Sequence, residues 1–229
     1  MSAKANNHPV VVLISADGEW QATFESLSPT EKYASPYGEY FRHTAGPNKF
    51  IMFQSGWGKI AAAASTQYAI DKFKPQTIIN VGTCGGFLDK VKQGEVLLVN
   101  KTVIYDIVEQ MTEQDQALAA YTTAIDLEWI KKPYPLTVNV NILVSADQDI
   151  IPSSIPYLIE KFSAVAADWE SGAIAWVAGK NQIRCLILRV VSDVVSPEGS
   201  PAYNSYEYFT QASKTYIPPI IRSLPLWLQ

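Results

Sequence analysis

Short runs of apolar residues recur along the chain and alternate with longer segments of mixed polarity. Such runs are typical of strands that are buried on both faces, because a strand with one face in water alternates apolar and polar residues. Six runs fit this description, and they predict strands at residues 10–15, 50–54, 77–81, 96–104, 138–144 and 185–191.

The segments between these strands contain helix-like patterns. The clearest is the Ala-rich segment 59–73, which ends at Lys74 and Pro75. Further helices are predicted at 153–162, 169–179 and about 205–224. Pro218 and Pro219 should break or kink the last of them. Strands that alternate with helices predict an α/β fold with a mostly parallel central sheet, in which ligands bind at the carboxyl ends of the strands.

The composition is that of a globular protein. Of the 229 residues, 48% are hydrophobic and 17% are charged, so the chain can bury a large core. We expect a single domain over residues 1–229, with a flexible N-terminus at residues 1–9.

Charge and residue usage exclude several classes of function. The net charge is −4 and no run of Lys or Arg is present, so we expect no nucleic-acid partner. No apolar segment reaches the roughly 18 residues of a membrane span. With only His8 and His43 available, a metal site or a catalytic triad lacks the usual histidines, and we expect no metal and no cofactor. Cys84 and Cys185 are predicted to be buried, reduced thiols of a cytoplasmic protein.

Two Gly-rich segments directly follow predicted strands. Residues 82–86 read Gly-Thr-Cys-Gly-Gly, and residues 55–59 read Ser-Gly-Trp-Gly-Lys before the first helix. Glycine allows a tight turn or a close approach of the backbone to a ligand, so each segment is either a strand exit or part of a binding site. The presence of two such segments favours a binding site.

Charged residues lie at the other strand ends. Asp168 is explained equally well as a helix N-cap, whereas Glu170 lies where this kind of sheet binds its ligand. Arg189 stands inside an apolar strand and needs a partner from another segment, for which Glu19 and Glu170 are candidates. Asp193 is about 13 Å from Arg189 along an extended strand, too far to pair with it. Taken alone, Glu19 is better explained as a surface residue of a helix than as a site residue.

Together these segments resemble the purine nucleoside phosphorylase and nucleosidase superfamily, and most closely its methylthioadenosine/S-adenosylhomocysteine nucleosidase branch. The matching segments occur in the family's order, at residues 14–19, 55–59, 80–86, 144–147, 168–170 and 189–193. The resemblance implies an α/β fold with a mixed, barrel-like central sheet flanked by helices. It also implies a purine nucleoside as the small-molecule ligand and assembly as a homodimer.

The resemblance further implies roles for individual residues. Asp193 matches the general acid that protonates purine N7, and Glu170 matches the carboxylate that holds the ribose hydroxyls. Glu19, Thr83 and Arg189 match groups around the attacking water. Ile150 matches a residue that contacts the base through its backbone, and Tyr206 matches an aromatic residue near the nucleoside. The other residues expected to bind substrate are Trp57, Gly85, Asp149, Trp169 and Ser192.

The chemistry agrees with these roles. Cleavage of a ribosidic bond develops positive charge on the sugar and negative charge on the departing base, so an acid at the base and carboxylates near the sugar stabilise both. Phosphorylases that resemble bacterial nucleoside phosphorylases carry arginines where this chain has Asp17, Glu19 and Asn80. Acidic side chains there would repel phosphate, which favours water as the nucleophile. The alternatives are a phosphorolytic member of the superfamily and a non-catalytic nucleoside-binding or storage protein.

Four positions depart from the nucleosidase branch. Asp149 stands where the branch has a base-stacking Phe, Trp169 replaces a Met, Trp57 replaces a smaller apolar residue, and Thr83 replaces a Ser. The two indoles should narrow the pocket for the 5′ group, so we expect weak activity on S-adenosylhomocysteine. Either Asp149 hydrogen-bonds the base, or it points to solvent and Tyr203 or Tyr206 supplies the stacking surface.

Overall fold

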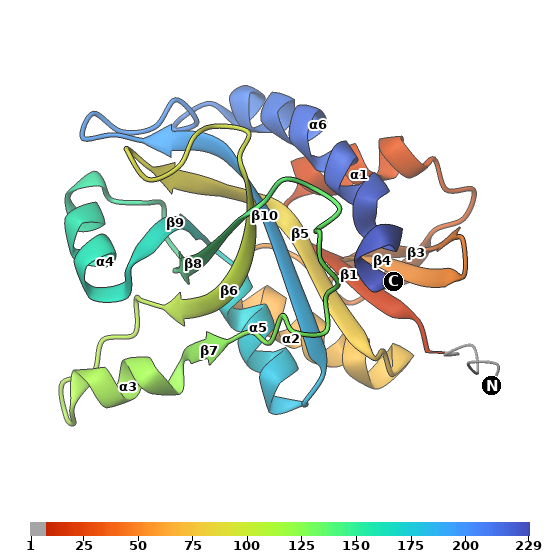
Figure 1. Ribbon diagram of the computed structural model, residues 1–229, viewed down its shortest axis with the longest axis horizontal. Helices are drawn as coiled ribbons and strands as arrows, with labels where there is room; N and C mark the ends of the chain where they lie inside the picture. The colour runs from red at the N-terminus through yellow and green to blue at the C-terminus, as the bar shows by residue number, and fades with distance from the viewer. Residues whose placement is uncertain (1–7) are drawn as a thin grey trace.

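The described part of the chain, residues 8–229 of a computed structural model, forms a ten-stranded mixed sheet (Figure 1). Of the predicted flexible N-terminus, residues 1–7 lie outside this part. The strands are β1 (Val10–Ile14), β2 (Tyr33–Ser35), β3 (Gly38–Ala45), β4 (Asn48–Gln54), β5 (Thr77–Phe87), β6 (Val96–Ile104), β7 (Thr122–Ala124), β8 (Asn139–Ser145), β9 (Ala164–Asp168) and β10 (Arg184–Val195). The helices are α1 (Asp17–Leu27), α2 (Gly58–Phe73), α3 (Gln114–Ala120), α4 (Ile155–Phe162), α5 (Ser171–Lys180) and α6 (Tyr206–Ser223), with short 3-10 helices at Pro152–Ser154 and Leu224–Leu228.

The long strand β5 organises the sheet. It pairs in parallel with β1 and β10 and antiparallel with β9. The pairs β10–β6, β6–β8 and β8–β9 complete a closed ring, so that β5, β9, β8, β6 and β10 form a barrel. β1, β4, β3 and β2 extend from β5 as an open wing. The predicted α/β fold with a barrel-like mixed sheet is therefore confirmed.

Two helix pairs cover the sheet. α1 packs beside α6, and α2 packs beside α5 at the opposite side of the sheet (Figure 1). Under the first pair lies an apolar core with Trp20, Phe41 and Trp227, and under the second pair lies one with Phe53 and Ile174. Burial of these faces is the main driving force that fixes the helices on the sheet.

All six predicted strands are present, but the predicted end of the third strand at residue 81 is wrong. Residues 82–87 continue β5, and Gly82 lies opposite Arg189 of β10. A Cβ atom at Gly82 would be 1.7 Å from Nη1 of Arg189. The glycine therefore serves the close approach of a buried guanidinium to the strand, and it does not mark a turn.

The helix predictions hold for α2, α4, α5 and α6, and of the two effects predicted for the prolines of α6, a break does not occur. The helix is not broken at Pro218 and Pro219, and it continues to Ser223. The prolines remove hydrogen bonds from the carbonyls four residues earlier, at Lys214 and Thr215, but both residues are exposed, so water can satisfy these carbonyls. Strands β2, β3, β7 and β9 and helices α1 and α3 were not predicted.

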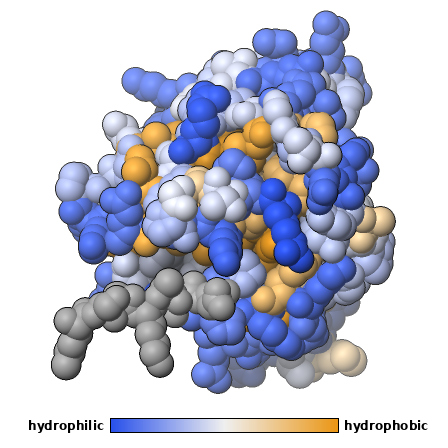
Figure 2. All heavy atoms as spheres, turned by 90° about the vertical axis from the view of Figure 1, so that its right-hand side faces the viewer, coloured by the Kyte–Doolittle hydropathy of each residue, from blue (hydrophilic) through white to orange (hydrophobic). Residues whose placement is uncertain are grey.

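On the face shown in Figure 2, hydrophilic side chains surround a group of apolar atoms. This face is the right-hand side of Figure 1, where the β3–β4 hairpin and the end of α6 lie. A small hollow of about 150 Å³ between these elements is lined mainly by apolar residues such as Leu27 and Met52. None of the helices in residues 8–229 has the length and apolar character needed to cross a bilayer.

Candidate active site

The candidate site is a cavity of about 790 Å³. It lies where β1, β4 and β9 end and where the longer strands β5 and β10 pass. This volume is typical of a small-molecule site. The predicted site residues that line it are Glu19, Trp57, Thr83, Gly85, Asp149, Ile150, Trp169, Glu170, Ser192, Asp193 and Tyr206. Arg189 is the exception, because it is fully buried and does not line the cavity.

Arg189 is held by groups from three other segments. Its Nη2 lies 2.7 Å from Oδ2 of Asp168 and donates a hydrogen bond of 2.7 Å to Oδ1 of Asn80. Its Nε donates to Oγ of Ser171 at 2.9 Å. Glu170, one of the two predicted partners, is farther away at 3.9 Å. The guanidinium is thus engaged with the protein, and it acts on the cavity through its charge.

The prediction for the partner of Arg189 missed Asp168. This carboxylate also accepts hydrogen bonds from Ser145 Oγ at 2.5 Å and from Ser171 N and Oγ. The Ser171 N–H belongs to the first turn of α5, so Asp168 binds the start of this helix, but the N-cap residue is Glu170 and the N-cap interpretation of Asp168 is wrong. Glu19, the other candidate, forms no ion pair with Arg189 within residues 8–229, although the two charges interact. The sequence could not show that Asp168 and Arg189 meet, because β9 and β10, the strands that carry them, come together only by pairing with β5.

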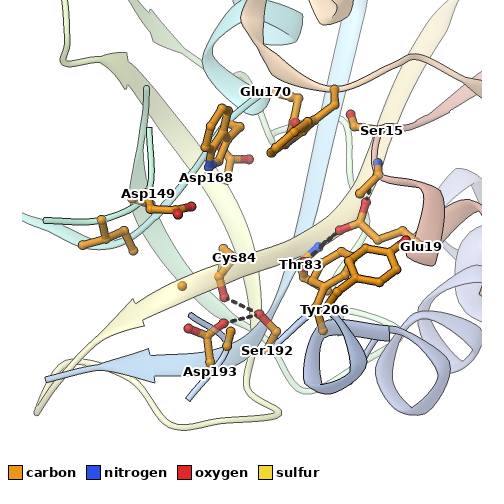
Figure 3. Close-up of a pocket in the computed structure, with 18 of the residues that line it drawn as sticks. Ser15, Glu19, Thr83, Cys84, Asp149, Asp168, Glu170, Ser192, Asp193 and Tyr206 are labelled. Atoms are coloured by element: carbon orange, nitrogen blue, oxygen red, sulfur yellow. Dashed lines mark hydrogen bonds between the residues drawn. The ribbon is translucent and has the colours of Figure 1, made fainter. Parts of the chain in front are cut away.

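Glu19 lies in the first turn of α1 and is buried, with only 3% of its surface exposed. Its Oε1 accepts hydrogen bonds from Thr83 N at 2.6 Å and Thr83 Oγ1 at 2.8 Å, and its Oε2 accepts one from Ala16 N at 3.4 Å (Figure 3). Burial raises the pKa of this carboxyl above its ordinary value, while the charge of Arg189 and these hydrogen bonds act in the opposite direction. A carboxylate so placed is a stronger base than a solvated glutamate.

Glu170 lies at the junction between β9 and α5, and its Oε1 accepts a hydrogen bond of 3.1 Å from Gly58 N at the start of α2. The side chain is buried, and burial raises its pKa to about 8. The neighbouring charge of Asp168 adds to this increase, and Arg189 opposes it. Glu170 is therefore a buried acceptor whose protonation changes near neutral pH.

Asp193 lies on the other side of the cavity, just after a bulge in β10. Its Oδ1 is 2.6 Å from Ser192 Oγ, and its Oδ2 accepts a hydrogen bond from Ser200 Oγ. Ser192 Oγ is also 3.2 Å from the carbonyl oxygen of Cys84, and Figure 3 shows these groups in a row. One hydroxyl proton cannot serve two acceptors fully. Ser192 therefore links Asp193 to the backbone of β5.

Aromatic side chains border the cavity. Trp57 and Trp169 stack with ring centroids 4.7 Å apart, and Trp57 is 67% exposed. Tyr206, at the start of α6, is 68% exposed and packs near Phe209. These rings offer flat apolar surfaces to a bound molecule. The two indoles lie on the same side of the cavity as Glu170, which is bonded to Gly58.

The loop after β10 contributes two further hydroxyl groups near Asp193 and Ile150. Ser200 was not predicted as a site residue and does not line the cavity, but its hydroxyl donates a hydrogen bond to Asp193. Tyr203 follows in the same loop and donates a hydrogen bond to the carbonyl oxygen of Ile150. Ile150 in turn fits against Gly85, where a Cβ atom would lie 2.5 Å from Cδ1 of Ile150. Loop residues of this kind have no periodic pattern that a sequence could reveal.

The charge of the cavity wall is one-sided. Six acidic side chains line it, those of Asp17, Glu19, Asp149, Asp168, Glu170 and Asp193. Among residues 8–229, no Lys or Arg side chain lines it. The buried charge of Arg189 is matched by Asp168 and is not available to an anionic ligand. Such a wall repels phosphate and attracts hydroxyl and N–H donors.

Paired acids on opposite sides of a cavity at strand ends are the features of a site that cleaves or forms a bond to a sugar. Residues 10–223 match the family model described as the phosphorylase superfamily, and the chain belongs to that superfamily. The predicted family is thereby confirmed.

Individual relatives agree with this assignment. The 5′-methylthioadenosine/S-adenosylhomocysteine nucleosidase of Tolumonas auensis is 24% identical over 213 residues, which cover 87% of this chain and 93% of the relative. The enzyme of the same name from Buchnera aphidicola is 30% identical over 174 residues, 71% of this chain and 75% of the relative.

Solved structures share the fold. The apo 5′-methylthioadenosine nucleosidase of Arabidopsis thaliana superposes with a TM-score of 0.79 at 21% identity, covering 95% of each chain. The futalosine hydrolase of Helicobacter pylori gives a TM-score of 0.78 at 16% identity, covering 95% of this chain and 97% of that one.

Proposed function

We propose that the protein is a purine nucleosidase, which uses water to cleave the N-glycosidic bond and releases a free purine and a ribose derivative. The observation that supports this proposal most strongly is that Asp193 and Glu19 line one cavity, to whose wall residues 8–229 contribute no Lys or Arg side chain. The relatives named as nucleosidases support the same reaction.

In this mechanism the base leaves as a neutral purine. Asp193 gives its proton to purine N7, so that the electron pair of the breaking C–N bond is accepted by a protonated ring. Ser192 holds the acid through the hydrogen bond at Oδ1. After the reaction Asp193 is a carboxylate, and it regains its proton from solvent.

The sugar is stabilised from the opposite side. As the bond breaks, positive charge develops on the ribose ring, and the acidic wall lowers the energy of that charge. Glu170 binds the ribose hydroxyls, which donate to its carboxylate. Glu19, whose pKa burial raises, accepts a proton from the attacking water as the water oxygen bonds to the anomeric carbon. Thr83 fixes Glu19 with two hydrogen bonds.

Arg189 is a positioning residue in this scheme. It does not line the cavity, and its donors hold Asp168, Asn80 and Ser171. The positive charge of Arg189 favours the ionised forms of the neighbouring acids. It acts to lower the pKa of Glu19 and opposes the increase in the pKa of Glu170.

We also propose that the enzyme works as a homodimer in the cytoplasm. Exposed apolar side chains support a self-contact, because Ile60 on α2 is 84% exposed, and Val108 and Met111 are 76% and 91% exposed. The buried free thiols of Cys84 and Cys185 suit a reducing compartment. Light scattering after size exclusion tests the dimer, and a monomer at micromolar concentration would reject it.

Incubation with adenosine, inosine and methylthioadenosine, followed by separate detection of free purine and reducing sugar, tests the reaction. The proposal requires equal amounts of both products. It also requires Glu19→Gln to lose about 10²–10⁴-fold in kcat, as expected for a lost general base. Tight binding of nucleosides without any product would instead identify a binding protein.

A further inference from the structure

Two acidic side chains from neighbouring strand ends bind the first turn of α2. Glu170 Oε1 accepts a hydrogen bond of 3.1 Å from Gly58 N. Asp147 Oδ1 accepts one of 2.7 Å from the next backbone N–H, that of Lys59. β8 and β9 pair in parallel, and each of the two acids stands two residues after the last pair of this register. Glu170 belongs to the proposed mechanism, whereas Asp147 has no part in it and does not line the cavity.

The start of α2 has no side-chain cap of its own. Its N-cap residue is Trp57, and an indole cannot accept a hydrogen bond from the helix. Gly56 and Gly58, on either side, have φ angles of 80° and 83°, and glycine restricts the backbone less than any other residue. The direction of the Gly58 N–H therefore depends on bonds to other segments, and Asp147 supplies the bond at the following residue.

Asp147 is itself held in a closed ring with Lys59 and Asp106. The Lys59 amine donates to Asp106 Oδ1 and lies 3.7 Å from Asp147 Oδ2. Asp106 stands two residues after the end of β6, and its Oδ2 accepts a hydrogen bond of 3.0 Å from Asp147 N. Lys59 and Asp106 are partly buried, so salt screens their charges less than those of an exposed pair. The ring ties the ends of β6 and β8 to the first turn of α2.

The bond from Gly58 fixes the orientation of the Glu170 carboxylate. It occupies Oε1, and Oε2 lies 3.9 Å from Arg189 Nη2, too far for a hydrogen bond. In the proposed mechanism the ribose hydroxyls donate to this carboxylate, and a displacement of about 1 Å can cost about 100-fold in rate. Loss of the Gly58 donor would also raise the pKa of Glu170 further, because this bond acts to lower it. Protonated Glu170 would be a poorer acceptor for hydroxyl groups.

We infer that Asp147 is a positioning residue for the ribose-binding carboxylate. With Lys59 and Asp106 it fixes the start of α2, so that the Gly58 N–H holds Glu170 in place for the ribose hydroxyls. The inference rests on the proposed function. It assigns to Asp147 an effect on recognition of the sugar hydroxyls, which a residue needed only for the stability of the fold would not have.

The test compares adenosine with 2′,3′-dideoxyadenosine, which has the same base and lacks both hydroxyls that Glu170 is proposed to bind. Asp147→Ala in the full chain should lower kcat/KM about 10-fold for adenosine and less than about 2-fold for the dideoxy nucleoside. If the wild type cleaves inosine and not adenosine, inosine and 2′,3′-dideoxyinosine take their places. A circular dichroism spectrum checks that the variant is folded.

Two further variants separate positioning from a general structural effect. Asp147→Asn keeps an oxygen that can accept from Lys59 N, so it should stay within about 3-fold of the wild type on both substrates. Asp126→Ala is the matched control, because Asp126 Oδ1 also accepts from a backbone N–H, that of Glu128 at 2.8 Å, but Asp126 does not line the cavity. It should leave the ratio of the two kcat/KM values unchanged.

If Asp147→Ala does not fold, Lys59→Met takes its place. This variant keeps the backbone N–H that Asp147 binds and removes the amine of the ring, so it should lower the adenosine-to-dideoxyadenosine ratio about 3-fold. If the wild type cleaves no purine nucleoside, the proposed function fails, and the inference fails with it. If the nucleoside is cleaved but the variant lowers both kcat/KM values equally, or lowers neither, the inference is overturned and the function stands.

Discussion

Ser192 Oγ lies 2.6 Å from Oδ1 of Asp193, its neighbour in the chain. Two consecutive residues of a regular strand point to opposite faces, so this contact depends on the bulge between Val191 and Asp193 in β10. The bulge turns both side chains toward the cavity, where Ser192 also reaches the carbonyl oxygen of Cys84. A local irregularity of one strand thus holds the proposed acid in place.

The first prediction concerns this acid. Asp193→Asn keeps the shape of the side chain and cannot protonate N7, so kcat should fall about 10²–10⁴-fold while the fold is retained. Steady-state kinetics and a circular dichroism spectrum check the two parts. Ser192→Ala should have a smaller effect, because it removes only the group that holds Asp193. Wild-type turnover in a folded Asp193→Asn protein would exclude Asp193 from the mechanism.

The second prediction concerns stability and pH. The pKa of Glu170 is about 8 in the folded protein, whereas that of an ordinary glutamate, as in the unfolded chain, is 4.5. Between these values the folded chain keeps a proton that the unfolded chain releases, so the free energy of unfolding decreases as pH rises through this window. The contribution of protonated Glu170 to the free energy of unfolding is fully present below pH 4.5 and is lost above about pH 8.

Urea unfolding of the wild type and of Glu170→Gln at pH 5 to 8.5 measures this effect. The variant should lose less stability than the wild type as pH rises, because its amide does not titrate. Glu25→Gln, an exposed change on α1, serves as the control and should follow the wild type. Parallel pH profiles for wild type and Glu170→Gln would contradict the burial of an ionisable Glu170.

The third prediction concerns the 5′ side of the substrate. Trp57 stacks on Trp169 at the side of the cavity where Glu170 lies, and a long, charged 5′ substituent has to pass this pair. Wild-type activity on S-adenosylhomocysteine should therefore be weak. Trp57→Leu should raise kcat/KM for S-adenosylhomocysteine relative to methylthioadenosine. Because Trp57 is exposed, its replacement should change the stability of the fold only slightly. A wild-type preference for S-adenosylhomocysteine over nucleosides with small 5′ groups would disprove this account.

The sequence predicted the parts of the fold that depend on local pattern. β1 has a continuous apolar run, β6 and β8 contain shorter ones, and α2 has a strong helical composition, so both kinds of element could be located. The exposed strands β2 and β3 were missed because their residues are partly in water and carry no such run. Gly82 was misinterpreted because its function depends on Arg189, a residue more than a hundred positions away.

The site was predictable where the family's motifs fix it and unpredictable where contacts between distant segments decide it. Glu19, Glu170 and Asp193 were named from their motifs and line one cavity. The ion pair of Asp168 with Arg189 is formed only when β9 and β10 come together in the barrel. Tyr203 reaches Ile150 from a loop without regular structure, so its position follows from tertiary packing alone.

The identity of the sugar product in the presence of phosphate tests the central claim most directly. Six acidic side chains and no basic side chain line the cavity in residues 8–229, so phosphate should be excluded and water should attack the sugar. With a cleaved nucleoside and saturating phosphate, we predict free ribose or its 5′ derivative as the only sugar product, at the rate measured without phosphate. Formation of a sugar 1-phosphate, with a rate that depends on phosphate concentration, would contradict hydrolysis.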